Sequence, residues 1–158
     1  TGNMKFMLNG AITLGTLDGA SVEIVKEAGE ENEYIFGMKV EDIDELRKKG
    51  YDPRFPYNNV TGLKQVVDAL IDGKLSDLGS GIYREIHSLL MERGDQYFVL
   101  EDFEDYRRKQ REINRDYKDK ISWAKKMLKN IANAGKFSSD RTILEYANEI
   151  WNIKETKV

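Results

Sequence analysis

The 158-residue sequence has no cysteine, which excludes disulfides, cysteine-ligated zinc and a thiol nucleophile. Its one histidine, His87, lacks the companions that a metal site or a histidine-based triad needs. No apolar run approaches the ~20 residues that cross a bilayer. The 25 Lys and Arg residues do not outnumber the 28 Asp and Glu residues, so no basic surplus is present for nucleic acid. We expect no metal site, no nucleic-acid partner, no membrane partner and a cytoplasmic location.

The composition is that of a folded protein: 40% of the residues are hydrophobic and 34% are charged. The length falls in the usual single-domain range of ~100–200 residues, so residues 1–158 are expected to form one domain. The chain opens with Thr1 and Gly2, and its first methionine is Met4. We therefore expect either processing or a piece of a longer protein.

The first third of the chain alternates between helix and strand patterns. Apolar spacing and β-branched runs predict a helix, a strand, a helix, a strand and a helix, at residues 3–8, 11–17, 21–28, 34–37 and 41–49. The next segment, 51–57, carries both prolines and is expected to be a loop.

From residue 60 onward the pattern is almost entirely helical. Leu63 starts one apolar stripe and Ile82 starts another, and both are expected to face the same core. Residues 97–100 could form a short strand. Further helices are predicted at 101–117 and 121–134, and from Ser138 or Ser139 to the C-terminal region. The inward positions expected on the last two helices are Ala124, Met127, Leu128, Ile131, Ile143, Ala147, Ile150 and Trp151. Because two or three short strands are not stable alone, the pattern indicates an α/β fold from which part of the sheet is missing.

Two other groups of residues are weak candidates for chemistry. The acidic group Glu30, Glu31 and Glu33 lacks the spacing and the glycine of a calcium loop, so a solvated charge run is expected. The pair Gly135 and Lys136 lacks the frame of a phosphate loop and is typical of a helix stop.

The strongest candidate is Lys5, which lies between apolar residues near the start of the chain. Apolar neighbours would desolvate the amine and favour the neutral form that attacks an aldehyde. Thr1 and Gly2, just ahead of the predicted helix, would offer a hydroxyl and amide donors to a phosphate. An amine beside a phosphate cradle is what pyridoxal phosphate requires. Taken alone the pattern is weak, because a lysine near a chain end is usually solvated.

The same segment, GNMKFMLNGAITLGTLDGA at residues 2–20, resembles the pyridoxal-phosphate attachment segment of the glycogen, starch and maltodextrin phosphorylases. The resemblance continues in order through residues 29–32, 35–38, 50–53, 132–143 and 149–151, and so covers nearly the whole chain. Ser21 departs from the family, which usually has asparagine there. The family's Glu-Ala-Ser/Cys-Gly stretch, which would precede Thr1, is not in this sequence.

The resemblance implies a C-terminal fragment of an α-glucan phosphorylase. The fold implied is α/β: the helix-rich C-terminal part of a doubly wound domain of the glycosyltransferase GT-B type. The activity implied for the parent is phosphorolysis of α-1,4-glucan to glucose 1-phosphate by a homodimeric enzyme. Lys5 would form the Schiff base with pyridoxal phosphate, and Thr1 and Gly2 would lie at the cofactor phosphate.

The upstream catalytic parts are absent, so no catalytic set is complete here and the isolated chain is expected to be inactive. The isolated chain is compatible with either the presence or the absence of the cofactor, and its uncovered faces favour self-association. The alternative is a non-catalytic binding or regulatory module that reuses the phosphorylase C-terminal fold and leaves Lys5 idle. A third reading is a structural interaction protein whose exposed apolar surface pairs with a partner.

Overall fold

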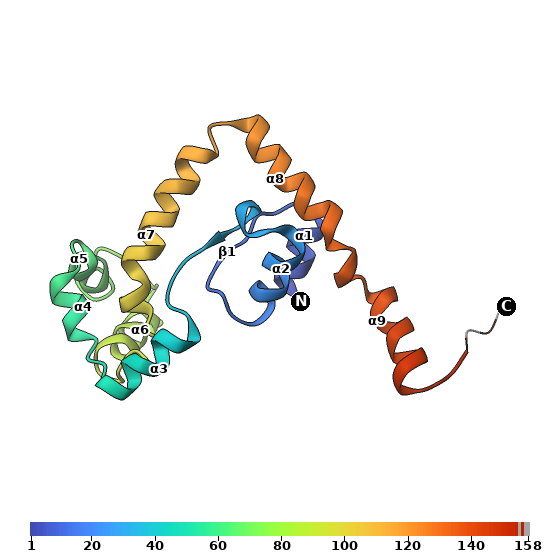
Figure 1. The fold of residues 1–158 in the computed structure, drawn as a ribbon. Helices are drawn as coiled ribbons and strands as arrows, with labels where there is room; N and C mark the ends of the chain where they lie inside the picture. The colour runs from blue at the N-terminus through green and yellow to red at the C-terminus, as the bar shows by residue number, and fades with distance from the viewer. Residues whose placement is uncertain (155, 157–158) are drawn as a thin grey trace. The chain divides into compact units, whose positions relative to one another are not determined.

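The computed structural model describes residues 1–154 and 156, and it is rich in helix with one small sheet (Figure 1). The chain divides into two compact units. Unit 1 comprises residues 1–35 and 113–158, and unit 2 comprises residues 36–112. No helix among the described residues is long and apolar enough to cross a membrane.

Unit 1 contains the sheet and the helices around it. Its elements are α1 (Gly2–Leu8), β1 (Leu14–Gly15), α2 (Gly19–Ala28), the 3-10 turn η1 (Glu30–Asn32), β2 (Tyr34–Ile35), α8 (Lys120–Asn133), the 3-10 turn η2 (Ala134–Phe137), α9 (Ser139–Glu145) and the π turn η3 (Tyr146–Ile150). The strands are parallel, with Leu14 opposite Tyr34 and Gly15 opposite Ile35. This confirms the predicted excess of helix over strand.

The core of unit 1 is small. Met7 from α1, Ile24 and Ala28 from α2, and Ala134 from η2 are buried together, with Phe137 packed against them. Met7 and Ala134 lie far apart in the sequence, so α1 is held in place by the segment that follows α8.

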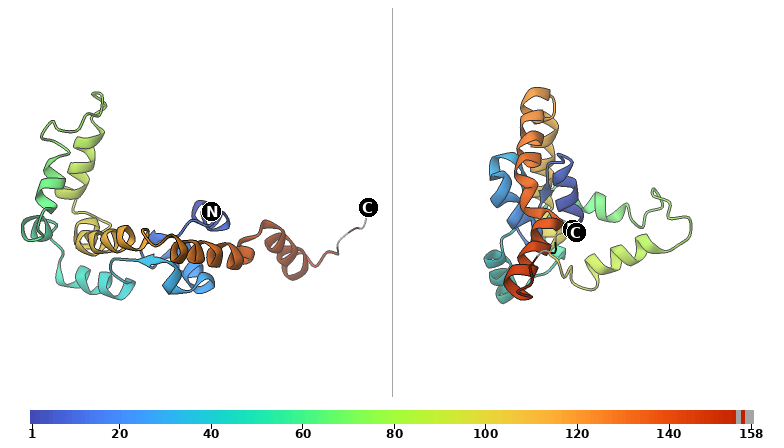
Figure 2. Two further views of the ribbon diagram at one scale, coloured as in Figure 1. Left: turned by 90° about the horizontal axis from the view of Figure 1, so that it is seen from above. Right: turned by 90° about the vertical axis from the view of Figure 1, so that its right-hand side faces the viewer.

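Unit 2 contains α3 (Val40–Lys49), α4 (Arg54–Asn59), α5 (Leu63–Asp68), α6 (Ile82–Met91) and all but the last turn of α7 (Val99–Asp116). The connection between α5 and α6 extends beyond both helices (Figure 2). Leu63, Val67 and Leu100 are buried together. The residues packed around them are Tyr57, Val60, Leu90, Met91 and Phe103.

The loop predicted at residues 51–57 is wrong in its second half, where α4 begins. Pro53 is the N-cap and Pro56 lies in the first turn. The first N–H groups of a helix have no partner within the helix, so a proline there removes no helical hydrogen bond.

The strand predicted at residues 97–100 is also wrong. Phe98 has a φ of +56°, outside the extended region, and α7 starts at Val99. The carboxylate of Asp95 accepts hydrogen bonds from Val99 N at 3.0 Å and Leu100 N at 2.9 Å. Those bonds satisfy amides at the start of α7, which favours helix over strand.

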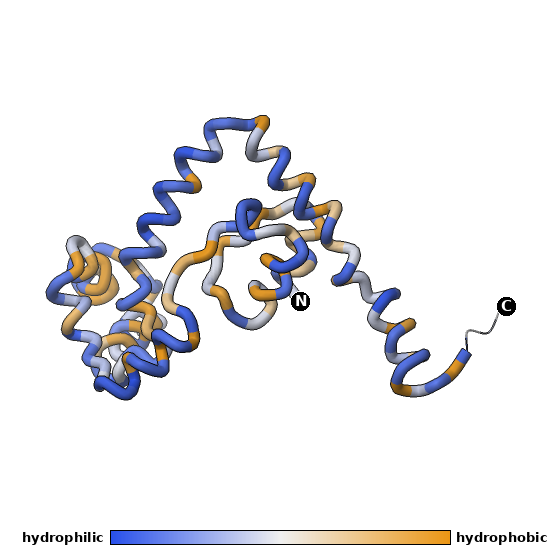
Figure 3. The backbone as a smooth tube through the Cα atoms, viewed as in Figure 1, coloured by the Kyte–Doolittle hydropathy of each residue, from blue (hydrophilic) through white to orange (hydrophobic). Residues whose placement is uncertain are grey.

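Several predicted inward positions are exposed. On α6, Leu90 reaches the core, but Ile82 and Leu89 are 50% and 43% exposed. On α8, Leu128 is 64% exposed, whereas Asn130 is fully buried. The tube in Figure 3 shows apolar residues recurring along α8, while most of α7 is hydrophilic. Periodicity thus identified the apolar stripes but not which of them find a partner in this chain.

Candidate functional site

Helix α1 carries the candidate lysine and has hydrogen bonds at both ends. Lys5 N donates to Thr1 O at 3.1 Å, so these two residues lie one turn apart on the helix. At the other end, Asn9 Nδ2 donates to Lys5 O at 2.8 Å. Met7 is the only buried residue of α1 and anchors it to the unit 1 core.

The predicted desolvation of Lys5 is not found in this chain, because the Lys5 side chain is exposed. Its neighbour Phe6 is 66% exposed and Leu8 is 44% exposed, so only Met7 turns inward. An apolar sequence neighbourhood desolvates an amine only where the neighbours pack around it, and these residues have nothing to pack against here.

A pocket of about 380 Å³ lies beside α1 in unit 1. Thr1 and Lys5 both line it, so the structure brings together two of the three residues predicted for the site. Gly2, the third predicted residue, does not line the pocket. The space beside its Cα is open, because a Cβ added there would meet no atom within 4 Å. The other lining residues are Met4, Leu8, Glu23, Lys136, Phe137, Ser139, Arg141, Thr142 and Ile143.

Two cationic residues of this pocket, Lys136 and Arg141, were not predicted as site residues. Lys136 Nζ lies 3.0 Å from Glu27 Oε1. The Arg141 guanidinium donates to Lys136 O at 2.5 Å and pairs with Glu145. Their place depends on the packing of η2 and α9 in unit 1, for which the sequence has no local signal. With Lys5 they place three cations and one acid, Glu23, in the lining, and two of the cations are paired with acids just outside it, Glu27 and Glu145.

The pocket fits pyridoxal phosphate in its size and in the kinds of side chain that line it. Its volume lies in the range of ~300–1,000 Å³ that is usual for small-molecule sites. An exposed primary amine is available at Lys5, and the cationic lining suits a phosphate-bearing ligand. Apolar side chains, including Met4, Leu8 and Phe137, would contact a ring.

A second hollow of about 180 Å³ is lined by Asn3 and Phe6 of α1 and by residues 11–14. It contains no titratable side chain. We therefore assign it no chemistry.

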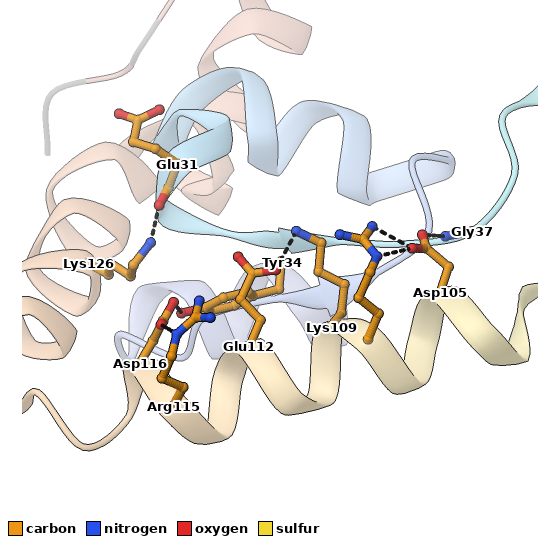
Figure 4. A network of polar contacts seen from close by, with 10 residues as sticks. Glu31, Tyr34, Gly37, Asp105, Lys109, Glu112, Arg115, Asp116 and Lys126 are labelled. Atoms are coloured by element: carbon orange, nitrogen blue, oxygen red, sulfur yellow. Dashed lines mark hydrogen bonds and ion pairs between the residues drawn. The ribbon is translucent and has the colours of Figure 1, made fainter.

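The acidic group at η1 differs from its prediction. Glu30 and Glu31 are exposed as expected, but Glu33 is 5% exposed. Its carboxylate accepts a hydrogen bond from Thr13 N at 2.5 Å, and burial raises its pKa above the ordinary value of 4.5. Figure 4 shows the neighbouring contact, in which Lys126 donates to the Glu31 carbonyl.

A metal centre is not supported within residues 1–154 and 156, where no group of three or more histidine, cysteine or acidic side chains could hold an ion. His87 lies partly buried on α6. It belongs to unit 2, whereas the Lys5 pocket belongs to unit 1.

Comparison with known proteins agrees with the resemblance in the sequence. A sequence model of the family described as carbohydrate phosphorylase matches residues 1–153. The chain is 46% identical over 157 residues to the muscle form of glycogen phosphorylase from Homo sapiens, covering 99% of this chain and 18% of that protein. It is 49% identical over 154 residues to the brain form from Mus musculus, covering 98% of this chain and again 18% of that protein. The chain belongs to the carbohydrate phosphorylase family.

Proposed function

We propose that the chain is the C-terminal portion of an enzyme that cleaves α-1,4-glucan with inorganic phosphate and releases glucose 1-phosphate in the cytoplasm. The observation that carries the proposal is the match of residues 1–153 to carbohydrate phosphorylases, together with the pocket that contains Lys5. In this proposal the chain is the helix-rich end of a doubly wound GT-B domain, and β1 and β2 would belong to the sheet of that domain. The substrates are α-glucan and phosphate, and the parent enzyme is a homodimer.

Lys5 is the proposed attachment residue for pyridoxal phosphate. When bound, the cofactor supplies a phosphate group that takes part in proton transfer. Lys5 would hold the cofactor through its amine, and Thr1, the N-cap of α1 one turn before Lys5, would lie beside the cofactor phosphate together with Gly2. The cationic side chains of Lys136 and Arg141 favour an anionic ligand in the same pocket.

The chain alone is proposed to be inactive. Phosphorolysis requires a proton donor, a phosphate clamp and a sugar pocket to converge within a few ångströms, and this chain spans about 18% of its relatives' length. Incubation with maltoheptaose and phosphate should release no glucose 1-phosphate. Its exposed apolar residues, including Leu128 and Ile131, also favour self-association.

The attachment site is tested by treating the chain with pyridoxal phosphate, reducing with borohydride and mapping the labelled peptides. Label should concentrate on Lys5 and disappear from that peptide in Lys5→Ala. The matched control is Lys26→Ala, which removes an exposed lysine of α2 outside the pocket and should leave the labelling unchanged. Label spread evenly over exposed lysines would show that this chain has no preorganised pocket.

The parent activity is tested in the full-length protein that contains this chain. It should release glucose 1-phosphate from α-glucan and phosphate, and Lys5→Ala should abolish that release. A full-length protein without this activity, whose binding to glucan is unaffected by Lys5→Ala, would instead favour the non-catalytic module.

A further inference from the structure

Two cationic side chains of the Lys5 pocket are held by acids that lie outside its lining. Lys136 of η2 and Arg141 of α9 line the pocket, whereas their partners Glu27 and Glu145 do not. Lys136 Nζ donates to Glu27 Oε1 at 3.0 Å, and Arg141 Nη1 donates to Glu145. The four side chains are between 28% and 49% exposed, so both pairs are partly packed against the chain. Each acid therefore holds its cation without entering the pocket.

The guanidinium of Arg141 is fixed at two of its three nitrogens. Nε donates to the Lys136 carbonyl at 2.5 Å, and Nη1 donates to Glu145. A guanidinium is a rigid planar fork, so bonds at two nitrogens define the direction of the third. Nη2 donates to no residue within 1–154 and 156. This nitrogen is the part of Arg141 that remains for a ligand in the pocket.

Lys136 also has donors to spare. An ammonium group has three N–H donors, and Glu27 is the one hydrogen-bond partner of Lys136 Nζ in the described part of the chain. The carbonyl of the same residue holds Arg141, so the two cations are positioned together. Charged donors form the stronger hydrogen bonds, and a phosphate group accepts several of them at once. The arrangement therefore suits a phosphate better than a ligand with one acceptor.

A surplus of positive charge does not explain the pocket. The cations Lys5, Lys136 and Arg141 are balanced by the lining acid Glu23 and by the two acids that hold Lys136 and Arg141. Glu23 is exposed in the lining and should repel an anion. Recognition of a phosphate must therefore come from donors that point in fixed directions, and orientation by neighbouring groups provides them.

We propose that Lys136 and Arg141 form a phosphate grip, a pair of side chains that selects ligands carrying a phosphate group. Arg141 Nη2 and the remaining N–H groups of Lys136 donate to the phosphate oxygens. Glu27 and Glu145 are positioning residues that orient these donors. The grip deepens the proposed function and rests on it for the source of the phosphate, which is the cofactor or free inorganic phosphate.

The first test compares pyridoxal phosphate with pyridoxal, which has the same aldehyde without the phosphate. The measurement is the concentration of each compound that half-saturates labelling of Lys5 after borohydride reduction. The native chain should prefer pyridoxal phosphate, and Arg141→Gln or Lys136→Gln should each reduce that preference about tenfold. Because both compounds react through the aldehyde, their ratio cancels a change in the reactivity of Lys5.

Matched variants separate the grip from charge and from folding. Lys26→Gln removes an exposed charge of α2 outside the pocket and should retain the preference. Glu23→Gln removes an acid from the lining and should increase it. Arg141→Lys keeps the charge but loses the planar fork, so it should also reduce the preference. An equal preference in Arg141→Gln, Lys136→Gln and Lys26→Gln would overturn the grip.

The second test needs neither a variant nor an aldehyde. Inorganic phosphate is added to the native chain at constant ionic strength, and the side-chain ¹⁵N signals of Arg141 and Lys136 are followed by NMR. Both should shift to saturation with one midpoint, while the signal of Lys26 should not. No saturable shift, or an equal shift at Lys26, would overturn the grip.

The same titration distinguishes the two sources of phosphate. If the cofactor supplies the group, a chain whose Lys5 carries reduced pyridoxal phosphate should no longer respond to inorganic phosphate. A persisting response would support the grip with free phosphate as its ligand. A saturable response in a chain whose Lys5 cannot be labelled would support the grip and contradict the proposed attachment site.

Discussion

Replacing Met7 with alanine should destabilise unit 1 more than any neighbouring change on α1. Met7 is 0% exposed and packs with Ile24, Ala28 and Ala134. Truncation of a buried methionine costs ~2–5 kcal/mol, and the value depends on how far the surroundings collapse into the space. Two of the three buried neighbours are alanines, whose short side chains cannot fill it. We therefore expect a loss of about 3 kcal/mol, or more than a hundredfold in the unfolding equilibrium.

The assay is urea unfolding followed by tryptophan fluorescence. Both tryptophans of the chain, Trp123 and Trp151, belong to unit 1, so the signal does not report on unit 2. Phe6→Ala is the matched control, because Phe6 is the adjacent residue of the same helix and is 66% exposed. It should change stability by no more than ~0.5 kcal/mol. Equal losses in Met7→Ala and Phe6→Ala would refute the assignment of α1 to this core.

Two further predictions concern other parts of the chain. Gly37→Ala should cost at least ~2 kcal/mol in urea unfolding followed by circular dichroism, because the φ of Gly37 is +81° and the new Cβ would lie 2.6 Å from an Asp102 oxygen. Gly50→Ala is the control, because Gly50 has a similar φ of +86° but open space around the new Cβ, so it measures the cost of the backbone conformation alone. Equal losses of stability in Gly37→Ala and Gly50→Ala would count against the clash with Asp102. At Asp119, hydrogen bonds from the Ser122 side chain and backbone lower the pKa of the carboxyl below 3.8. The contribution of this cap to helix stability is complete above the pKa that Asp119 has in the unfolded chain, and it is lost as pH falls through the lower pKa of the folded chain. In an acid titration followed by helicity, Asp119→Asn should therefore lose less helix than the unchanged chain. An identical titration in both proteins would contradict the prediction.

The sequence predicted the helices of unit 1 well, because apolar periodicity and local breakers define them. It also placed Thr1 just ahead of the short helix that carries Lys5, and Thr1 is the N-cap of α1. It did not predict that Lys136 and Arg141 line the same pocket, because their position depends on how η2 and α9 pack in unit 1. The burial of Glu33 was missed for the same reason, since its sequence neighbours Glu30 and Glu31 are exposed.

The end of the chain shows a different limit. A regular 3.6-residue period placed Trp151 on the same stripe as Ile143, but α9 is followed by the π turn η3. Trp151 N donates to Tyr146 O at 2.9 Å, a span of five residues. The wider turn shifts the positions after it relative to an α-helix. The ring of Trp151 consequently lies 5.8 Å from that of Tyr146.

The division of unit 1 into two stretches of sequence has a consequence for the order of folding. Residues 36–112 form unit 2 and are synthesised between the two stretches. Met7 cannot meet Ala134 until α8 has left the ribosome, so α1, although it is made before α8, is among the last elements of unit 1 to be packed. The entropy of closing so long a loop grows slowly with its length, by about 0.6 kcal/mol for each doubling. The delay is therefore chiefly one of time, during which α1 and its exposed apolar residues must remain unpaired without aggregating.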